Sequence, residues 1–182
     1  MSRQFIIALG VSAAVILGIF GYRHLETRSA AAGQASIGTL IGRDLPSTAI
    51  VTPLHGGDPR ALSDEIVGTT VINFFASWCA PCRAESAVLL QLRGEGVRVI
   101  GVAVRDEPAA AQAFLDELED PYFRVMADPQ GEAMQALGLG SDLPQTLVVS
   151  SDGRLLMRHS GALLGADGEA ALAEIRDLAG PR

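Results

Sequence analysis

The chain has 182 residues, 48% of them hydrophobic, which leaves room for one domain of ordinary size and a short appendage. It carries 14 arginines, no lysine and 21 acidic residues, and the absence of lysine excludes Schiff-base enzymes and Walker-type phosphate loops. The arginines are scattered along the chain rather than gathered into a patch, so nucleic acid is not expected as a partner.

The first element is an uncharged apolar run over residues 4–22. As a helix it would be roughly 28 Å long, about the thickness of a hydrocarbon core. This length and the lack of a polar face argue against a helix buried in a soluble core. A cleaved signal peptide is the stronger alternative, because Arg3 precedes the run and small residues follow it at 29–35. We expect residues 1–25 to be a retained single-pass membrane anchor and residues 26–38 a linker.

Residues 39–182 predict one α/β domain. The Asp152-Gly153 step is a strong hairpin signal, and Pro81 suits the first turn of a helix, where a missing amide costs nothing. In chain order, the predicted elements are extended pieces within 45–54 that suit an edge or a hairpin, a helical turn at 61–67, a strand at 69–75, a helix from residue 80 that ends at 94–96, a strand at 97–104, a helix at 107–119, a strand at 123–126, a short helix at 130–137, strands at 146–150 and 155–159, and a closing helix at 166–178. This alternation predicts parallel crossovers followed by a hairpin, in a mixed sheet with helices on both faces.

Both cysteines of the chain, Cys79 and Cys82, lie where the strand at 69–75 meets the next helix. A zinc site needs four ligands, and the three histidines are not spaced as a pair with the cysteines. Haem attachment needs a histidine directly after the second cysteine, and Arg83 stands there. Two inert thiols remain an alternative, although a strand-to-helix junction is seldom core.

A redox role has a positive physical argument. At a helix start the sulfur of Cys79 lies beside unpaired amides and the positive end of the helix dipole, which favour the nucleophilic thiolate. Cys82 lies one turn along the same helical face and is close enough to form a disulfide with Cys79. Trp78 is expected to cover the pair on one side. The chemistry needs no cofactor.

The motif WCAPC at 78–82 after the strand VINFF, together with the downstream Leu143-Pro144-Gln145-Thr146, resembles the thioredoxin-like fold. The resemblance is closest to the membrane-anchored thiol reductases of cytochrome c maturation, the CcmG/DsbE group, with the TlpA/ResA-like proteins next. It covers most of residues 37–180 and implies a protein of the bacterial inner membrane whose C-terminal domain lies in the periplasm. It also implies apocytochrome c as the client and a membrane thiol-transfer protein of the CcdA/DsbD type as the electron donor.

Carried over to this chain, the resemblance makes Cys79 the attacking thiol, Cys82 the resolving thiol and Glu85 the acidic residue near them. Glu85 would shuttle a proton or raise a cysteine pKa, and the alternative is a solvated acid that suits the helix dipole. Asn73 stands where ordinary thioredoxins have a buried aspartate. The resemblance further implies that Pro144 is cis and faces the dithiol. The residues expected to line the client groove are Trp78, Leu143, Pro144 and Gln145.

The loop before Pro144 departs from the group's pattern, because it is one residue longer and has Gln145 in place of an acid. The client is therefore the open part of the prediction. A TlpA-like reductase with other envelope clients, and a non-catalytic module that binds apocytochrome or copper, are the alternatives. A thiol peroxidase is disfavoured, because Ala76 stands where such enzymes carry a threonine three residues before the cysteine.

Overall fold

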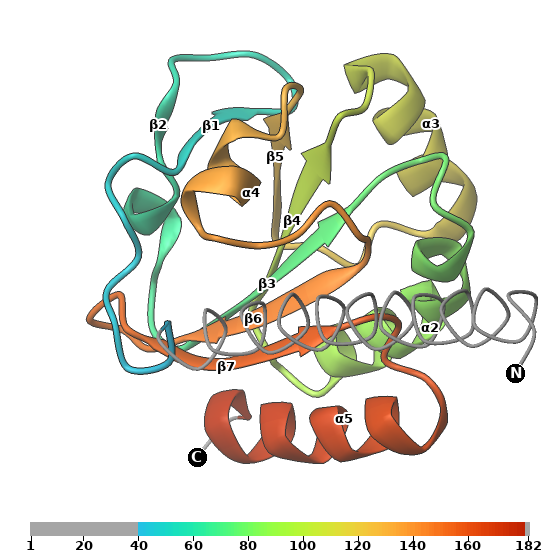
Figure 1. Ribbon diagram of the computed structural model, residues 1–182. Helices are drawn as coiled ribbons and strands as arrows, with labels where there is room; N and C mark the ends of the chain where they lie inside the picture. The colour runs from blue at the N-terminus through green and yellow to red at the C-terminus, as the bar shows by residue number, and fades with distance from the viewer. Residues whose placement is uncertain (1–39, 181–182) are drawn as a thin grey trace, which may run out of the picture. The chain divides into compact units, whose positions relative to one another are not determined.

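A seven-stranded mixed sheet organises the residues that the computed structural model describes, 40–180 (Figure 1). The strands are β1 (Ile50–Pro53), β2 (Arg60–Ala61), β3 (Thr70–Phe75), β4 (Val99–Val104), β5 (Arg124–Asp128), β6 (Gln145–Val149) and β7 (Leu155–Ser160). They lie in the order β2-β1-β5-β4-β3-β6-β7. The central strands β3, β4 and β5 are parallel, and the other neighbouring pairs are antiparallel.

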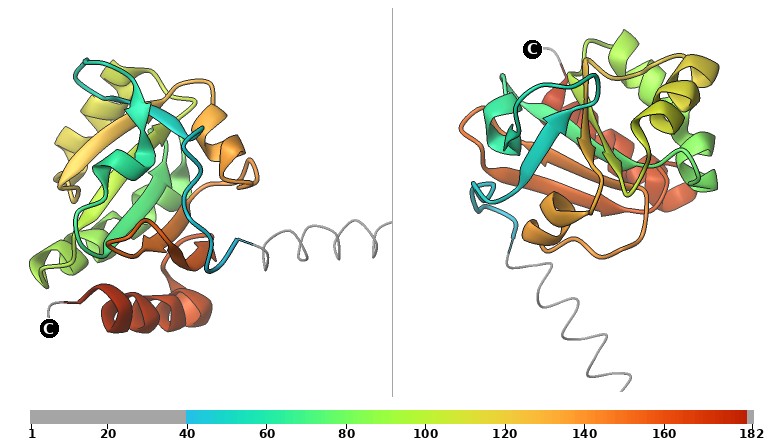
Figure 2. Two further views of the ribbon diagram at one scale, coloured as in Figure 1. Left: turned by 90° about the vertical axis from the view of Figure 1, so that its left-hand side faces the viewer. Right: turned by 90° about the horizontal axis from the view of Figure 1, so that it is seen from above.

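Helices cover both faces of this sheet. They are the 3-10 helix η1 (Leu62–Glu65) and the α-helices α2 (Ala80–Gly94), α3 (Pro108–Leu118), α4 (Glu132–Ala136) and α5 (Gly165–Ala179). Val71 and Phe75 of β3 pack in the apolar layer under α2, α3 and α5. Ile72 and Phe74 pack in the opposite layer under α4 and η1, so Figures 1 and 2 show α4 and α5 on opposite faces. This alternation confirms the predicted thioredoxin-like α/β fold with a mixed sheet.

The N-terminal part of the sheet differs in detail from the prediction. Residues 45–54 contain a single strand, β1, whose hairpin partner is the two-residue strand β2. β1 also pairs with β5 through Thr52 and Pro53, so it lies inside the sheet, and of the two predicted alternatives, an edge or a hairpin, the hairpin is the one confirmed. The pairing of β1 with β5 joins residues far apart in the chain, and local composition does not report it.

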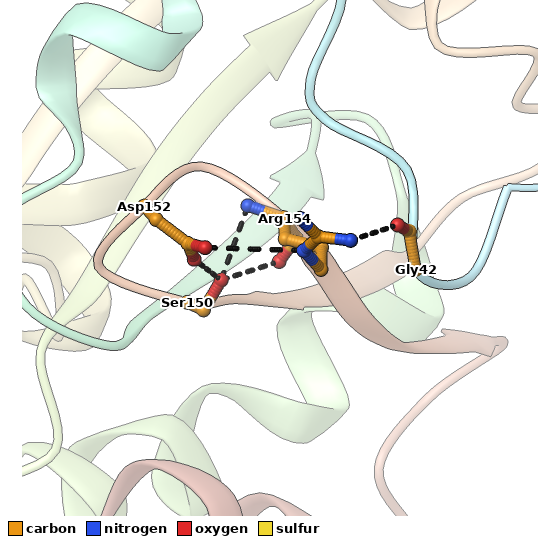
Figure 3. Close-up of polar contacts among 4 residues, drawn as sticks. All are labelled: Gly42, Ser150, Asp152 and Arg154. Carbon is orange, nitrogen blue, oxygen red and sulfur yellow. Dashed lines mark hydrogen bonds and ion pairs between the residues drawn. The ribbon is translucent and has the colours of Figure 1, made fainter.

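Arg154 ties the β6–β7 turn to the segment that leads into the domain (Figure 3). Its Nη1 donates to the carbonyl of Gly42 at 3.0 Å, and its amide donates to the Ser150 hydroxyl at 3.1 Å. The same hydroxyl bonds to the Asp152 carboxylate. Gly153 has a φ of 84°, which favours glycine and agrees with the predicted Asp-Gly hairpin. These contacts hold the chain entry beside β7.

The predicted membrane anchor at 1–25 and the linker at 26–38 lie outside the described residues. Among residues 40–180, none of the helices combines the length and the apolar character needed to cross a bilayer.

Candidate active site

A disulfide joins Cys79 and Cys82 at the start of α2, with their Cα atoms 5.3 Å apart. Cys79 is the N-cap of the helix, and its Sγ accepts a hydrogen bond from the amide of Cys82 at 3.2 Å. Pro81 lies in the first helical turn, as predicted. After reduction, the amide and the helix dipole would therefore stabilise a thiolate at Cys79.

A surface hollow of about 450 Å³ leads to this disulfide. One wall is made by the start of α2 and the other by the loop before Pro144; the lining residues are Trp78, Cys79, Ala80, Pro81, Ser141, Asp142 and Leu143. In the disulfide form both cysteines are buried, with 4% of Cys79 and 2% of Cys82 exposed. A partner thiol must therefore reach the disulfide through the hollow, where Cys79 is part of the wall and Cys82 is not.

Three of the four predicted groove residues lie at or next to this hollow. Trp78 is 60% exposed and forms part of its wall, while its indole Nε1 donates to the carbonyl of Arg105 at 3.1 Å. Leu143 lines the opposite wall, and the Leu143-Pro144 bond is cis, as the resemblance implied. Pro144 is buried directly before β6. Their contact with a client remains a prediction.

Gln145, the fourth predicted groove residue, lies away from the hollow and is only 1% exposed. Its Nε2 donates to the carbonyl of Asp142 at 3.0 Å and to the Ser160 hydroxyl at 2.8 Å. Its Oε1 accepts from Nε and Nη2 of Arg158, both at 3.1 Å. The structure therefore gives Gln145 the role of holding the loop before Pro144 against β7, and a direct client contact at this residue stays a prediction.

Glu85 is fully buried on α2, one turn from Cys82 on the same helical face. Its Oε1 accepts from Nδ2 of Asn73 at 2.9 Å, and its Oε2 accepts from the amide of Leu163 at 2.8 Å. Burial raises the pKa of Glu85 from 4.5 to about 7, although both hydrogen bonds act to lower it. The alternative of a solvated acid is therefore wrong, and Glu85 can gain or lose a proton near neutral pH.

Asn73 and Tyr122 fix the orientation of the groups around Glu85. The Tyr122 hydroxyl donates to Oδ1 of Asn73 at 2.7 Å, and Nδ2 of Asn73 also donates to the Thr146 hydroxyl at 3.2 Å. Burial, and then the nearby Glu85 carboxylate, raise the pKa of Tyr122 well above its ordinary value, so its hydroxyl stays a donor. Sequence reasoning missed Tyr122, because nothing local distinguishes it from a tyrosine that only fills the core.

The loop directly after β4 holds the active-site loop from the other side. The carboxylate of Asp106 accepts from the Ser77 amide at 2.5 Å and from the Ser77 hydroxyl at 2.8 Å. The carbonyl of Arg105 accepts the hydrogen bond from the Trp78 indole, and Nη2 of Arg105 donates to the carbonyl of Ser141 at 3.0 Å. The sequence analysis missed Arg105 and Asp106. The sequence did contain a signal for them. Cys79 follows β3, Arg105 and Asp106 follow β4, and residues that follow neighbouring parallel strands lie at the same edge of the sheet.

Metal binding finds no support in the part of the chain that the structure describes, because no three His, Cys, Asp or Glu side chains gather there into a possible ligand set.

The fold and the dithiol at the start of α2 define a thioredoxin-like thiol:disulfide oxidoreductase. Comparison with known proteins agrees, since the Redoxin family model matches residues 41–172. The DsbE homolog of Paracoccus denitrificans, a thiol:disulfide interchange protein, is 39% identical over 131 residues that cover 70% of each chain. The thiol:disulfide interchange protein HelX of Rhodobacter capsulatus is 38% identical over 125 residues, which cover 68% of this chain and 70% of HelX. The chain therefore belongs to the Redoxin family and, within it, to the DsbE/CcmG group.

Solved structures show the same fold. A thiol:disulfide interchange protein DsbE from Chlorobium tepidum superimposes with a TM-score of 0.61 at 24% sequence identity. The match covers 76% of this chain and 96% of that chain. The likeness includes nearly the whole of the neighbour's fold.

Proposed function

We propose that this oxidoreductase acts as a reductase that keeps the haem-binding cysteines of apocytochrome c reduced during cytochrome c maturation. Membership in the DsbE/CcmG group supports this proposal. In the proposed arrangement residues 1–25 anchor the chain in the bacterial inner membrane and the domain faces the periplasm. The observation that carries the thiol-exchange mechanism is the Cys79–Cys82 pair at the start of α2 with the buried Glu85, whose pKa is raised to about 7, one helical turn from Cys82.

The reaction is two successive thiol–disulfide exchanges. In the reduced protein the Cys79 thiolate attacks one sulfur of the client disulfide, and the other client sulfur leaves as a thiolate. Cys82 then loses its proton and attacks the Cys79 sulfur of the mixed disulfide. The second client thiolate leaves, and the protein holds the Cys79–Cys82 disulfide. Two electrons have passed from the protein to the client.

Glu85 serves both halves of this reaction. With a pKa of about 7, both forms of its carboxyl group are populated near neutral pH, so the carboxylate is available to take the proton that Cys82 must lose. Before that step, repulsion from the same negative charge disfavours a thiolate at Cys82 and keeps Cys82 from competing with Cys79. Asn73 and the amide of Leu163 hold the carboxylate in place.

The oxidised protein must then be reduced again before the next cycle. Because the bacterial periplasm is kept oxidising, a dithiol that faces it needs a supply of electrons. A membrane thiol-transfer protein of the CcdA/DsbD type would supply them by attacking the Cys79–Cys82 disulfide through the hollow. A membrane anchor would keep the domain beside such a donor.

Trapping in the native cell envelope tests the client. In the Cys82→Ser variant the mixed disulfide on Cys79 cannot be resolved, so the client stays covalently attached and can be identified by mass spectrometry. We expect apocytochrome c in this adduct, and nothing when Cys79 is replaced as well. Capture of unrelated envelope proteins would instead indicate a TlpA-like reductase. Non-covalent binding that persists without either cysteine would indicate a binding module.

A further inference from the structure

We propose that the hollow beside Arg105 is a subsite of the client groove that binds an acidic side chain of the client polypeptide. Arg105 would be the residue that selects this side chain. The inference rests on the proposed reductase function for having a polypeptide client, but it does not depend on which protein that client is.

The hollow has a volume of about 320 Å³ and adjoins the one over Cys79, because both share Ser141. Its lining residues are Arg105, Gln130, Gly131, Met134, Gln135, Leu139, Gly140 and Ser141. Arg105 is the one charged residue in this set. The buried Met134 and Leu139 give the hollow an apolar floor, and the exposed Gln130 and Gln135 add amide groups at its rim. An arginine without an acidic neighbour in the lining suits an anionic group.

Several contacts hold the Arg105 backbone in place before any client arrives. Its amide donates to the carbonyl of Asp128 at 3.0 Å, and its carbonyl accepts from the Trp78 indole at 3.1 Å. Arg105 has a φ of 48°, in the left-handed region that residues other than glycine rarely adopt. Such a conformation persists where the surroundings fix it, and it often marks a functional site.

Two contacts also restrain the exposed Arg105 side chain. Its stem packs over Gly131, where an added Cβ would lie 3.6 Å from Cγ and Cδ of Arg105. Nη2 donates to the carbonyl of Ser141 at 3.0 Å, which is the one side-chain hydrogen bond of Arg105 among the described residues. Donors on Nε and Nη1 are therefore left for a ligand, and the planar guanidinium matches the two oxygens of a carboxylate. Little ordering is needed on binding, which favours affinity.

The position of the hollow beside Arg105 indicates the path by which a client would reach it. A further hollow of about 320 Å³ also borders Arg105, but its lining includes the acidic Asp106 and Glu107, so an anionic group suits the hollow floored by Met134 and not this one. A client whose cysteine is at Cys79 would run past Ser141 toward Arg105. An acidic side chain a few residues from the client cysteine would then meet the guanidinium, because the two hollows adjoin at Ser141.

Paired peptide clients test this subsite. Every peptide has the same intramolecular disulfide and has acetylated and amidated ends. The peptides come in pairs that differ only by Glu or Gln at one position within about four residues of a cysteine. With the reduced full-length protein we expect at least one Glu peptide to have a kcat/KM about fivefold or more above its Gln partner, mainly through KM. Arg105→Gln should abolish this preference, and Arg105→Lys should retain part of it.

The controls separate a subsite from a general loss of structure. Arg176→Gln removes another exposed, hydrogen-bonded arginine, which pairs with Glu95, and it should keep the preference for the Glu peptide. The uncharged disulfide 2,2′-dithiodipyridine reports the dithiol alone, so dividing each peptide's kcat/KM by the rate with this reagent removes any effect that loss of the Arg105–Ser141 bond has on the hollow over Cys79. Because the ratio between paired peptides is measured within each variant, a change in the amount of folded protein leaves it unaltered.

Two results would overturn the inference: equal kcat/KM values for every Glu and Gln pair with the wild-type protein, or a preference that survives in Arg105→Gln. Failure of the proposed function looks different. In that case the reduced wild-type protein would react with 2,2′-dithiodipyridine but would transfer no electrons to any peptide disulfide.

Discussion

At the scale of single residues, burial decides what Glu85 does. The same side chain on the solvent side of α2 would be an ordinary ionised acid, but between Asn73, Leu163 and the core its carboxylate loses hydration that two hydrogen bonds do not replace. The raised pKa follows from this loss. Stability must then depend on pH, because the folded and unfolded chains hold the Glu85 proton with different affinity.

Replacing Glu85 by Gln is expected to flatten that pH dependence. The pKa of Glu85 is about 7 in the folded protein against 4.5 for an unperturbed glutamate, so between these values the folded state binds more protons than the unfolded state. The contribution is present in full below about pH 4.5 and is lost as the pH rises to about 7, a total of about 3 kcal/mol. Urea unfolding of the oxidised wild type and Glu85→Gln at about pH 5 and about pH 8 measures the difference. Parallel pH profiles would contradict it.

Gly101 makes room for the Tyr122 ring on β4. A Cβ at Gly101 would lie 2.6 Å from Cδ2 of Tyr122, well inside contact distance. Gly101→Ala is expected to lower the free energy of unfolding by about 1–3 kcal/mol, because ring and strand must move apart. Gly94→Ala is the matched control, since nothing lies within 4 Å of a Cβ there and α2 continues to that residue. It should leave stability unchanged or raise it by up to about 1 kcal/mol. Equal urea midpoints for the two variants would refute the packing argument.

At the scale of elements, the site is built where three loops meet at one edge of the sheet. The loop after β3 and the first turn of α2 carry Ser77 to Cys82, the loop after β4 carries Arg105 and Asp106, and the loop before β6 carries Ser141 to Pro144. Parallel strands bring the first two loops together, because their carboxyl ends lie at the same edge. The antiparallel β6 delivers the third loop from the opposite direction. Polar contacts between the loops then fix the walls of the hollow.

The short helix α4 depends on one buried carboxylate at the end of β5. Asp128 accepts from the amides of Ala133 at 3.2 Å and Met134 at 3.0 Å. Asp128→Ala is expected to cost about 1–2 kcal/mol, as for the loss of a helix cap, while Asp128→Asn retains one acceptor and should cost less. Urea unfolding gives the energies, and amide hydrogen exchange at Ala133 and Met134 locates the effect. Unchanged exchange at these two amides in Asp128→Ala would show that α4 does not need the carboxylate.

Local patterns allowed most of these elements to be predicted. β3, β4, α2, α3 and α5 each have a composition or periodicity that needs no partner to recognise. β2 was missed, because two residues have no periodicity and their pairing with β1 arises only when residues 54–59 fold back. Element boundaries differ by a few residues, as where β3 begins at Thr70. Thus the sequence predicted the order of the elements better than their lateral pairing.

In the candidate site, too, contacts between residues close in the chain could be predicted and contacts between distant residues could not. Cys79 caps α2 and Cys82 lies in its first turn, so their spacing predicted that they lie close together, whereas the place of Glu85 near them came from the family resemblance. By contrast, Ser77 and Asp106 are 29 residues apart, and Tyr122 and Asn73 are 49 residues apart. Those pairs exist only because the sheet brings separate strands together. Gln145 shows the reverse difficulty, since its position in the motif suggested the groove whereas its side chain turned toward Arg158.

At the scale of the whole molecule, the redox state and the stability of the domain are linked. A dithiol whose reduced form is stabilised by the fold gives up electrons reluctantly and acts as an oxidant, as in DsbA. Here both sulfurs are buried, and Glu85 lies one turn from Cys82. Burial and a neighbouring carboxylate both oppose a thiolate at Cys82, so the fold does little to stabilise the reduced form beyond the amide contact at Cys79. The oxidised form should accordingly be the more stable one.

We therefore expect the oxidised domain to unfold at a higher urea concentration than the reduced domain at neutral pH. The chain-entropy model for so short a disulfide loop suggests a difference of about 2 kcal/mol. Unfolding curves of the oxidised protein and of the protein kept in dithiothreitol measure it, and the double variant Cys79→Ser with Cys82→Ser serves as the control, because its stability should not respond to the reductant. Through the thermodynamic cycle this order corresponds to a low reduction potential, as the proposed reductase requires. A reduced form more stable than the oxidised one would make the domain an oxidant and would rule out electron flow toward the client.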